Sequence, residues 1–169
     1  AQESEVVAQQ IEAWAKRLKE KGLDIRFALV GYNAYGINGA MDICSLSDIT
    51  AFLNRPGRSG QTRTQGYEGE MADYYEALAQ DYATSNNKEC GGRARHYADA
   101  YYSFRYNAKR VYVNFTDEPN QPNYDPLYSV EFVKDQNNWE SWQGTIHTVY
   151  SAAKFTGSGD NEEPWLMSD

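Results

Sequence analysis

The sequence contains few of the residues that build metal or redox centres. Its 169 residues include two cysteines, Cys44 and Cys90, and two histidines, His96 and His147. Their spacing matches no zinc or redox motif, and the chain has no glycine-rich phosphate loop and no nucleophile elbow. Covalent catalysis therefore has no support in the sequence, and we predict that the protein is not an enzyme. A hydrolase that acts through Asp117 and His96 is the enzymatic alternative.

Positive charge and long hydrophobic runs are also scarce. The chain has 24 acidic and 16 basic residues, a formal net charge of -8. An acidic surface repels nucleic-acid phosphates, so nucleic acid is not an expected partner. No apolar run approaches the roughly 20 residues that a transmembrane helix needs. With 41% hydrophobic and 14% aromatic residues, the composition indicates one folded domain over residues 1–169.

The composition also bears on cellular location and on the cysteines. No secretory signal opens the chain, but 14 tyrosines and many Asn, Gly and Thr residues are typical of exported proteins. We predict an extracellular, cell-surface or periplasmic location. Cys90 lies in the polar, glycine-rich stretch 85–92, an unusual place for an unpaired buried cysteine. This favours a disulfide between Cys44 and Cys90, worth about 3 kcal/mol; two separate thiols are the alternative.

Hydrophobic periodicity predicts alternating helices and strands. Val7, Ile11, Trp14 and Leu18 form the apolar stripe of a helix over 4–21, which ends at Gly22. The run IRFALVGY over 25–32 reads as an inner parallel strand covered on both faces. Further strands are predicted over 40–46, 109–115 and 144–150, and further helices over 47–53, 68–83, 94–104 and 129–134. This order predicts an α/β fold, a doubly wound and mostly parallel open sheet with helices on both faces, in three layers.

The stretch VYVNFTDEPNQP begins as a strand and ends as a loop. Val111, Val113 and Phe115 alternate with polar residues, so we expect these three side chains to be buried. Asp117 stands at the tip of this strand, and Pro119 follows two residues later. In open α/β sheets ligands bind beyond the carboxyl ends of the strands. Asp117 is therefore a candidate ligand or metal position; an acid that caps the loop is the structural alternative.

Five stretches, in their order along the chain, carry a resemblance to a known family. They are IEAWAKRLKEKG, IRFALVGY, ECGGRARHYADAYYSF, AKRVYVNFTDEP and GTIHTVYS with EEPWLMSD. In these stretches the chain resembles the von Willebrand factor type A domain, a doubly wound α/β fold that is mostly a protein-binding module. The resemblance implies that Asp117, preceded by Thr116, supplies an acid to a metal-ion-dependent adhesion site for Mg²⁺ or Mn²⁺. A protein or matrix ligand would complete the coordination with its own acidic side chain.

The chain departs from this family at two places. The Asp-x-Ser-x-Ser sequence and the central first strand that carries it are absent, so we expect that strand to come from preceding residues or from another chain. Where the family usually has an oxygen ligand after the glycines, this chain has Arg93, Ala94 and Arg95. Arg93, His96 and Glu118 are expected on the ligand face beside Asp117. The alternative function is a structural or scaffold domain with a degenerate, metal-free site.

Overall fold

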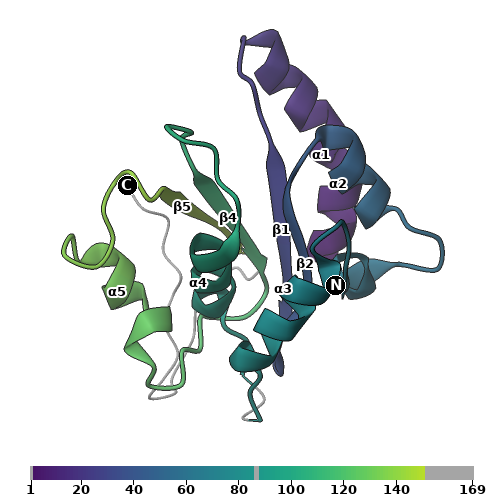
Figure 1. The fold of residues 1–169 in the computed structure, drawn as a ribbon. Coiled ribbons are helices and arrows are strands. Elements are labelled where there is room, and N and C mark those ends of the chain that lie inside the picture. Colours follow the sequence, from purple (N-terminus) through teal and green to yellow (C-terminus); the bar gives the residue numbers. More distant parts are fainter. Residues whose placement is uncertain (1, 86–87, 151–169) are drawn as a thin grey trace.

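The computed structural model describes residues 2–85 and 88–150. These residues form a mixed α/β fold with five α-helices, three short 3₁₀ helices and two small sheets (Figure 1). None of the described helices has both the length and the apolar content to cross a bilayer. The helices are α1 (Gln2–Glu20), α2 (Leu46–Leu53), α3 (Ala72–Ala79), α4 (Gly91–Tyr101), α5 (Val130–Lys134), η1 (Gly60–Thr64), η2 (Gln80–Tyr82) and η3 (Pro126–Tyr128).

The five strands divide between two sheets. Sheet A contains β1 (Phe27–Asn33), β2 (Gly36–Cys44) and β3 (Gly66–Tyr67) in the order β1-β2-β3. In it β1 and β2 are antiparallel, whereas β2 and β3 are parallel. Sheet B contains β4 (Val111–Thr116) and β5 (Thr145–Tyr150), which are parallel.

The prediction of one doubly wound, mostly parallel sheet is therefore wrong. The reason lies in the connection between β1 and β2, which is the two-residue turn Ala34-Tyr35. Parallel strands need a crossover of a dozen or more residues, so a connection this short forces a hairpin. The side chain of Asn33 accepts a hydrogen bond from the backbone N–H of Tyr35 at 2.8 Å, and Gly36 takes a φ of 123°. The sequence predicted a strand over 40–46, whereas β2 begins four residues earlier, at Gly36, and so reaches the turn.

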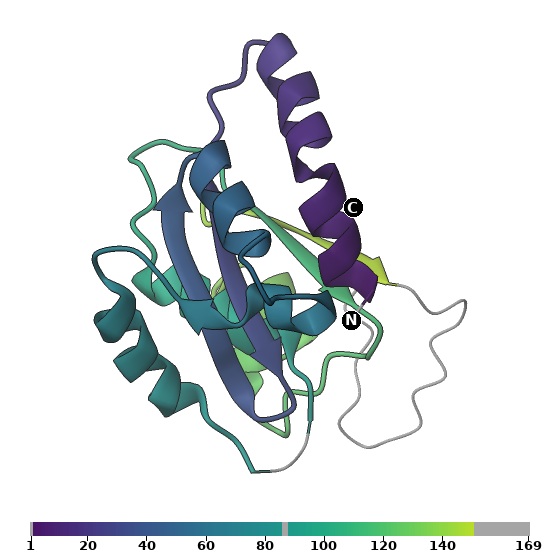
Figure 2. The ribbon, with the colours of Figure 1, turned by 90° about the vertical axis from the view of Figure 1, so that its right-hand side faces the viewer.

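Helices cover both faces of sheet A. One hydrophobic core joins α1 and α2 to the hairpin and contains the buried residues Ala8, Ile49, Phe52 and Leu53. The second core, on the opposite face, joins α3, η2 and α4 to β2. Figure 2 shows α1 and α3 on opposite sides of the β1–β2 hairpin. The layered arrangement that the sequence predicts thus holds around sheet A, although the sheet itself is smaller.

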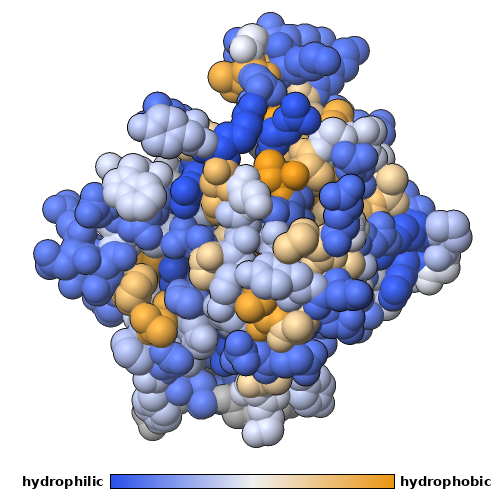
Figure 3. All heavy atoms as spheres, in the orientation of Figure 1, coloured by the Kyte–Doolittle hydropathy of each residue, from blue (hydrophilic) through white to orange (hydrophobic). Residues whose placement is uncertain are grey.

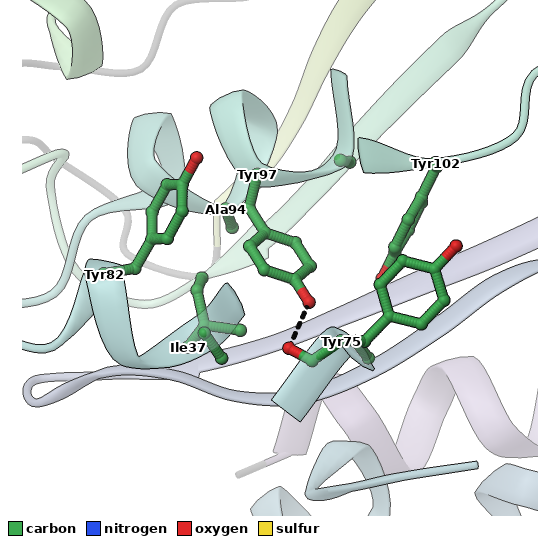
Figure 4. Close-up of a cluster of buried hydrophobic side chains, with 9 residues drawn as sticks. Ile37, Tyr75, Tyr82, Ala94, Tyr97 and Tyr102 are labelled. Carbon is green, nitrogen blue, oxygen red and sulfur yellow. Dashed lines mark hydrogen bonds between the residues drawn. The ribbon is translucent and has the colours of Figure 1, made fainter. Parts of the chain in front are cut away.

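Tyrosine side chains build the second core. Tyr97 of α4 is fully buried, and its hydroxyl donates a hydrogen bond to the backbone carbonyl of Tyr75 in α3 at 2.7 Å (Figure 4). The ring centroid of Tyr97 lies 5.2 Å from that of Tyr82 and 5.9 Å from that of Tyr102. Edge-to-face packing at these distances stabilises aromatic cores beyond the burial of area. These tyrosines are core residues.

Sheet B buries the opposite face from the one expected. Val111, Val113 and Phe115 are exposed by 59%, 39% and 38%, whereas the alternate residues of β4 face the interior. Interior residues of both strands pack on α5 and the following turn, in a core of Val130, Trp139 and Ile146. Alternation fixes two faces in a strand but does not say which one is covered. The apolar character of Val111, Val113 and Phe115 therefore misled the prediction.

Strands β1 and β4 are neighbours that do not pair with each other. Among the described residues β1 pairs with β2 alone and β4 with β5 alone. The two sheets lie beside one another in Figure 1, with β1 next to β4. A side-chain hydrogen bond joins them, in which the hydroxyl of Tyr32 donates to Oδ1 of Asn114 at 2.7 Å. The described residues contain no strand between β1 and β4, where the resemblance places its first strand.

The expected disulfide is also wrong, because Cys44 and Cys90 are both thiols. Cys44 pairs with Phe27 at the start of β1, and its thiol donates a hydrogen bond to the Phe27 carbonyl. Cys90 precedes Gly91, which contacts Asn114 near the far end of β1. A strand of this length spans about 20 Å, and a disulfide requires Cα atoms within about 7 Å. Opposite ends of one strand therefore cannot be bridged.

The buried hydroxyl of Tyr97 gives a direct test of the tyrosine core. We expect Tyr97→Phe to lower the free energy of unfolding by about 1 to 3 kcal/mol, because the Tyr75 carbonyl loses its partner. Tyr106→Phe is the matched control, since Tyr106 is 94% exposed. Urea denaturation of the three proteins measures the difference. Equal stability of the two variants would contradict this packing.

Candidate functional site

The carboxyl ends of β1 and β4 meet at the amino end of α4. Besides the bond between Tyr32 and Asn114, the backbone of Gly91 lies directly against Asn114. A Cβ atom on Gly91 would stand 2.4 Å from Nδ2 of Asn114, so a larger residue at this position would displace the Asn114 side chain. Burial raises the pKa of the Tyr32 hydroxyl above its ordinary value, which keeps this hydroxyl protonated and able to donate.

Asn120 fixes the loop that follows β4. Its Oδ1 accepts hydrogen bonds from the backbone N–H of Gly92 at 3.0 Å and from the thiol of Cys90 at 3.3 Å. Its Nδ2 donates to the carbonyl of Tyr128 at 2.9 Å. One side chain, 2% exposed, thus holds the first turn of α4, the loop and η3 together. Sequence reasoning missed Asn120, because it caps a helix that begins 29 positions earlier and leaves no local pattern.

Thr116 shapes the tip of β4. Its hydroxyl donates to the carbonyl of Glu118 at 2.8 Å and accepts from the N–H of Glu118 at 3.0 Å. Thr116 is buried, while Asp117 and Glu118 are exposed. The hydroxyl therefore serves the turn, and the turn presents Asp117 to solvent. A residue that binds a ligand must be exposed, and the place of Asp117 directly after a strand predicts this exposure.

Of the other two candidates, Arg93 is buried and His96 is half-buried. Arg93 is 7% exposed, and its guanidinium carbon lies 5.3 Å from the ring centroid of Tyr128. No described carboxylate, including that of Asp117, forms an ion pair with Arg93. His96 lies between two tyrosines, with Nδ1 2.9 Å from the hydroxyl of Tyr82 and its ring against Tyr128. The predicted ligand face thus separates into an exposed acidic tip and a buried basic layer.

The residues at this site do not form a divalent cation site by themselves. The described part of the chain contains no group of three or more His, Cys, Asp or Glu side chains placed to hold a metal ion. The Thr116 oxygen is used within its turn, and Ala94 offers no ligand. Mg²⁺ requires a near-octahedral set of oxygen ligands. Asp117 is exposed but alone in this role, so a cation there needs ligands from outside the described residues.

Comparisons with protein families, with curated proteins and with solved structures found no match to this chain. The site is therefore interpreted from its own geometry and from the sequence resemblance alone.

His96 should make stability depend on pH. Burial, followed by the nearby charge of Arg95, lowers its pKa below the ordinary value. The unfolded chain then binds a proton more readily than the folded chain, so stability falls as pH decreases through about 6.5. We expect His96→Gln to weaken this fall between about pH 7 and 5, above the range in which most carboxylates titrate. Urea denaturation across that range measures it.

A substitution without a titratable group provides the control. Asn138→Ala, at an exposed position, should leave the pH dependence between pH 7 and 5 unchanged. An equal effect of both substitutions would show that the dependence does not arise from the packing of His96 between Tyr82 and Tyr128.

The role of Asn120 has its own test. We expect Asn120→Ala to lower the free energy of unfolding by at least about 2 kcal/mol, since it leaves buried backbone groups of Gly92 and Tyr128 without partners. Asn138→Ala, at an exposed position, should change stability by less than about 0.5 kcal/mol. Thermal denaturation followed by circular dichroism compares the two. Similar effects would contradict the proposed anchoring.

Proposed function

We propose that this chain is a non-enzymatic protein-binding or adhesion module of the von Willebrand factor type A kind. Its ligand, a protein or a matrix component, docks on the loops beyond the carboxyl ends of β1 and β4. The observation that carries this proposal is the exposed carboxylate of Asp117 on a turn fixed by Thr116. A fixed, solvent-exposed charge loses little conformational freedom on binding.

The arrangement of elements supports the same proposal. The segments that resemble the family occur in its order, and β1 and β4 lie on either side of the position at which the family has its first strand. If an Asp-x-Ser-x-Ser segment is supplied there, its oxygens and Asp117 together would give Mg²⁺ or Mn²⁺ a set of hard ligands. In this protein the cation would neutralise an acidic side chain of the partner and fix its orientation.

The face of the molecule that Figure 3 shows is compatible with a polar contact. Figure 3 shows a largely hydrophilic face, with hydrophobic residues in small groups near its middle. A broad apolar interface would need a larger continuous patch on that face. Recognition through a few charged and hydrogen-bonding groups therefore suits it better. An extracellular, cell-surface or periplasmic location remains part of this proposal.

One observation favours a second candidate, a structural or scaffold domain without metal. The polar side chains that could face a ligand at this end of the sheets are engaged internally: Thr116 in its turn and Asn120 in three hydrogen bonds. In that case Asp117 only keeps the loop in solvent. The two candidates differ in whether replacement of Asp117 changes an interaction.

The binding proposal is tested with a defined panel of ligands. We expect saturable binding to at least one of immobilised collagen, fibrinogen and fibronectin, weakened at least about tenfold by Asp117→Asn, which corresponds to 1.4 kcal/mol. Asp81→Asn is the control, because Asp81 is also exposed but lies in η2. Surface plasmon resonance measures the affinities. Absence of binding, or equal affinities of the two variants, would leave the scaffold function.

Cation binding is tested separately. We expect MgCl₂ and MnCl₂ to leave the Tm of this chain alone unchanged, because Asp117 has no partner ligands among the described residues. Differential scanning calorimetry against matched NaCl measures it. A saturable rise in Tm that Asp117→Asn abolishes would contradict this expectation and show that the chain holds the cation unaided.

A further inference from the structure

Buried polar residues gather around α4. All six buried polar or charged side chains in the described part of the chain lie on α4, on β4 and β5, or in the loop that joins them to η3. They are Arg93, Arg95, Thr116, Asn120, Gln121 and Thr148. Both arginines are more than nine-tenths buried, with exposures of 7% and 5%. Taking a guanidinium out of water is costly unless an opposite charge accompanies it.

Neither arginine has an ion-pair partner among the described residues, although the Asp99 carboxylate, which pairs with Arg110, acts on Arg95 from one turn along α4. The guanidinium of Arg93 lies against the Tyr128 ring, and that of Arg95 lies 5.2 Å from the Phe132 centroid and 5.0 Å from the Trp139 centroid. Nη2 of Arg95 donates to the carbonyl of Leu127 at 2.6 Å. Aromatic stacking occupies the flat faces of these groups and leaves their N–H edges for hydrogen bonds.

The N–H edges of the two guanidinium groups are only partly occupied by hydrogen bonds. Nη1 of Arg93, Nε of Arg95 and the hydroxyl of Thr148 are buried and have no hydrogen-bond partner among the residues that the structure describes. Thr148 lies opposite Asn114 in sheet B, and Asn114 contacts the first residue of α4. Three buried groups able to donate, two of them cationic, thus lie on α4 and on sheet B, which contact each other at Gly91 and Asn114. Buried donors are almost always paired in folded proteins.

We propose that this contact binds one oxyanion, a carboxylate or a phosphate group, with Arg93 as its main partner and with Arg95 and Thr148 beside it. Planar guanidinium groups match the geometry of both anions and bind them through pairs of N–H bonds. The donors lie below the surface, so the ligand is a small anion or the end of a side chain. This site is distinct from the exposed Asp117 carboxylate, which would repel an anion.

The test titrates sodium phosphate and sodium acetate into the protein, each against sodium chloride at matched ionic strength. We expect at least one of them to raise the Tm saturably, by about 5 to 10 °C at 100 times its Kd. Preference for phosphate or for acetate identifies the anion class. No rise beyond that in chloride would overturn the proposal and indicate that ordered water serves these donors.

Substitutions locate the site. Arg93→Gln should weaken anion binding at least about tenfold. Thr148→Val should weaken it about threefold to tenfold. Arg17→Gln, on the exposed side of α1, should not change the Kd. An unchanged Kd in Arg93→Gln would overturn the proposal.

A measurement on the unmodified protein covers the case in which Arg93→Gln does not fold. The side-chain Nε–H resonance of Arg95 in a ¹⁵N spectrum should shift with the same Kd as the thermal titration. A resonance that does not move while the Tm rises would place the anion elsewhere. Because inorganic anions replace any protein partner here, this test succeeds or fails independently of the proposed binding function.

Discussion

The burial of the first two turns of α4 is the constraint on which the rest of the structure depends. Residues 91–95, 97 and 98 of this helix are all buried. One side contributes Tyr97 to the tyrosine core beneath sheet A, and another places Gly91 against Asn114 of sheet B. Since β1 and β4 share no backbone hydrogen bonds, α4 joins two sheets that are otherwise linked mainly by side chains. Its position therefore determines how the sheets stand relative to each other.

This constraint also explains the character of the site. Buried helical turns cannot place arginines in solvent, so Arg93 and Arg95 are buried with them, stacked on aromatic rings of η3, α5 and the following turn. The loop after β4 reaches back to the same helix through Asn120. Asp117 is consequently held on a turn above a basic interior, in a chain whose net charge is -8. Recognition at the tip and anion binding beneath it are separate consequences of one packing arrangement.

Local sequence signals predicted most elements, because they act over a few residues. The stripe of Val7, Ile11 and Trp14 predicted α1, and its end at Gly22 is observed with a φ of 80°. The N-cap of α2 is Ser45, whose side chain forms a capping box with Asp48; the helix predicted over 47–53 begins two residues after this cap. The exposure of Asp117 also follows from its place after a strand.

Long-range pairing was not predictable in this way. The antiparallel β1–β2 hairpin depends on a two-residue turn that the pattern IRFALVGY does not contain, and the covered face of β4 depends on where α4 and α5 pack. The anchoring by Asn120 and the burial of Arg93 join residues that are far apart in sequence or in different elements. A disulfide between Cys44 and Cys90 was inferred from the surroundings of one cysteine, without knowledge of the distance. Each of these features is a property of the tertiary structure.

Native-state hydrogen exchange tests the central role of α4 most directly. If α4 holds the two sheets together, the backbone amides of Tyr97 and Ala98 will exchange only through global unfolding, with the same free energy as the amide of Val30 in β1 and as urea denaturation. Exchange of the α4 amides at a clearly lower free energy, while Val30 stays protected, would show that the helix detaches without unfolding sheet A. That result would contradict the role of α4 as the element that joins the two sheets.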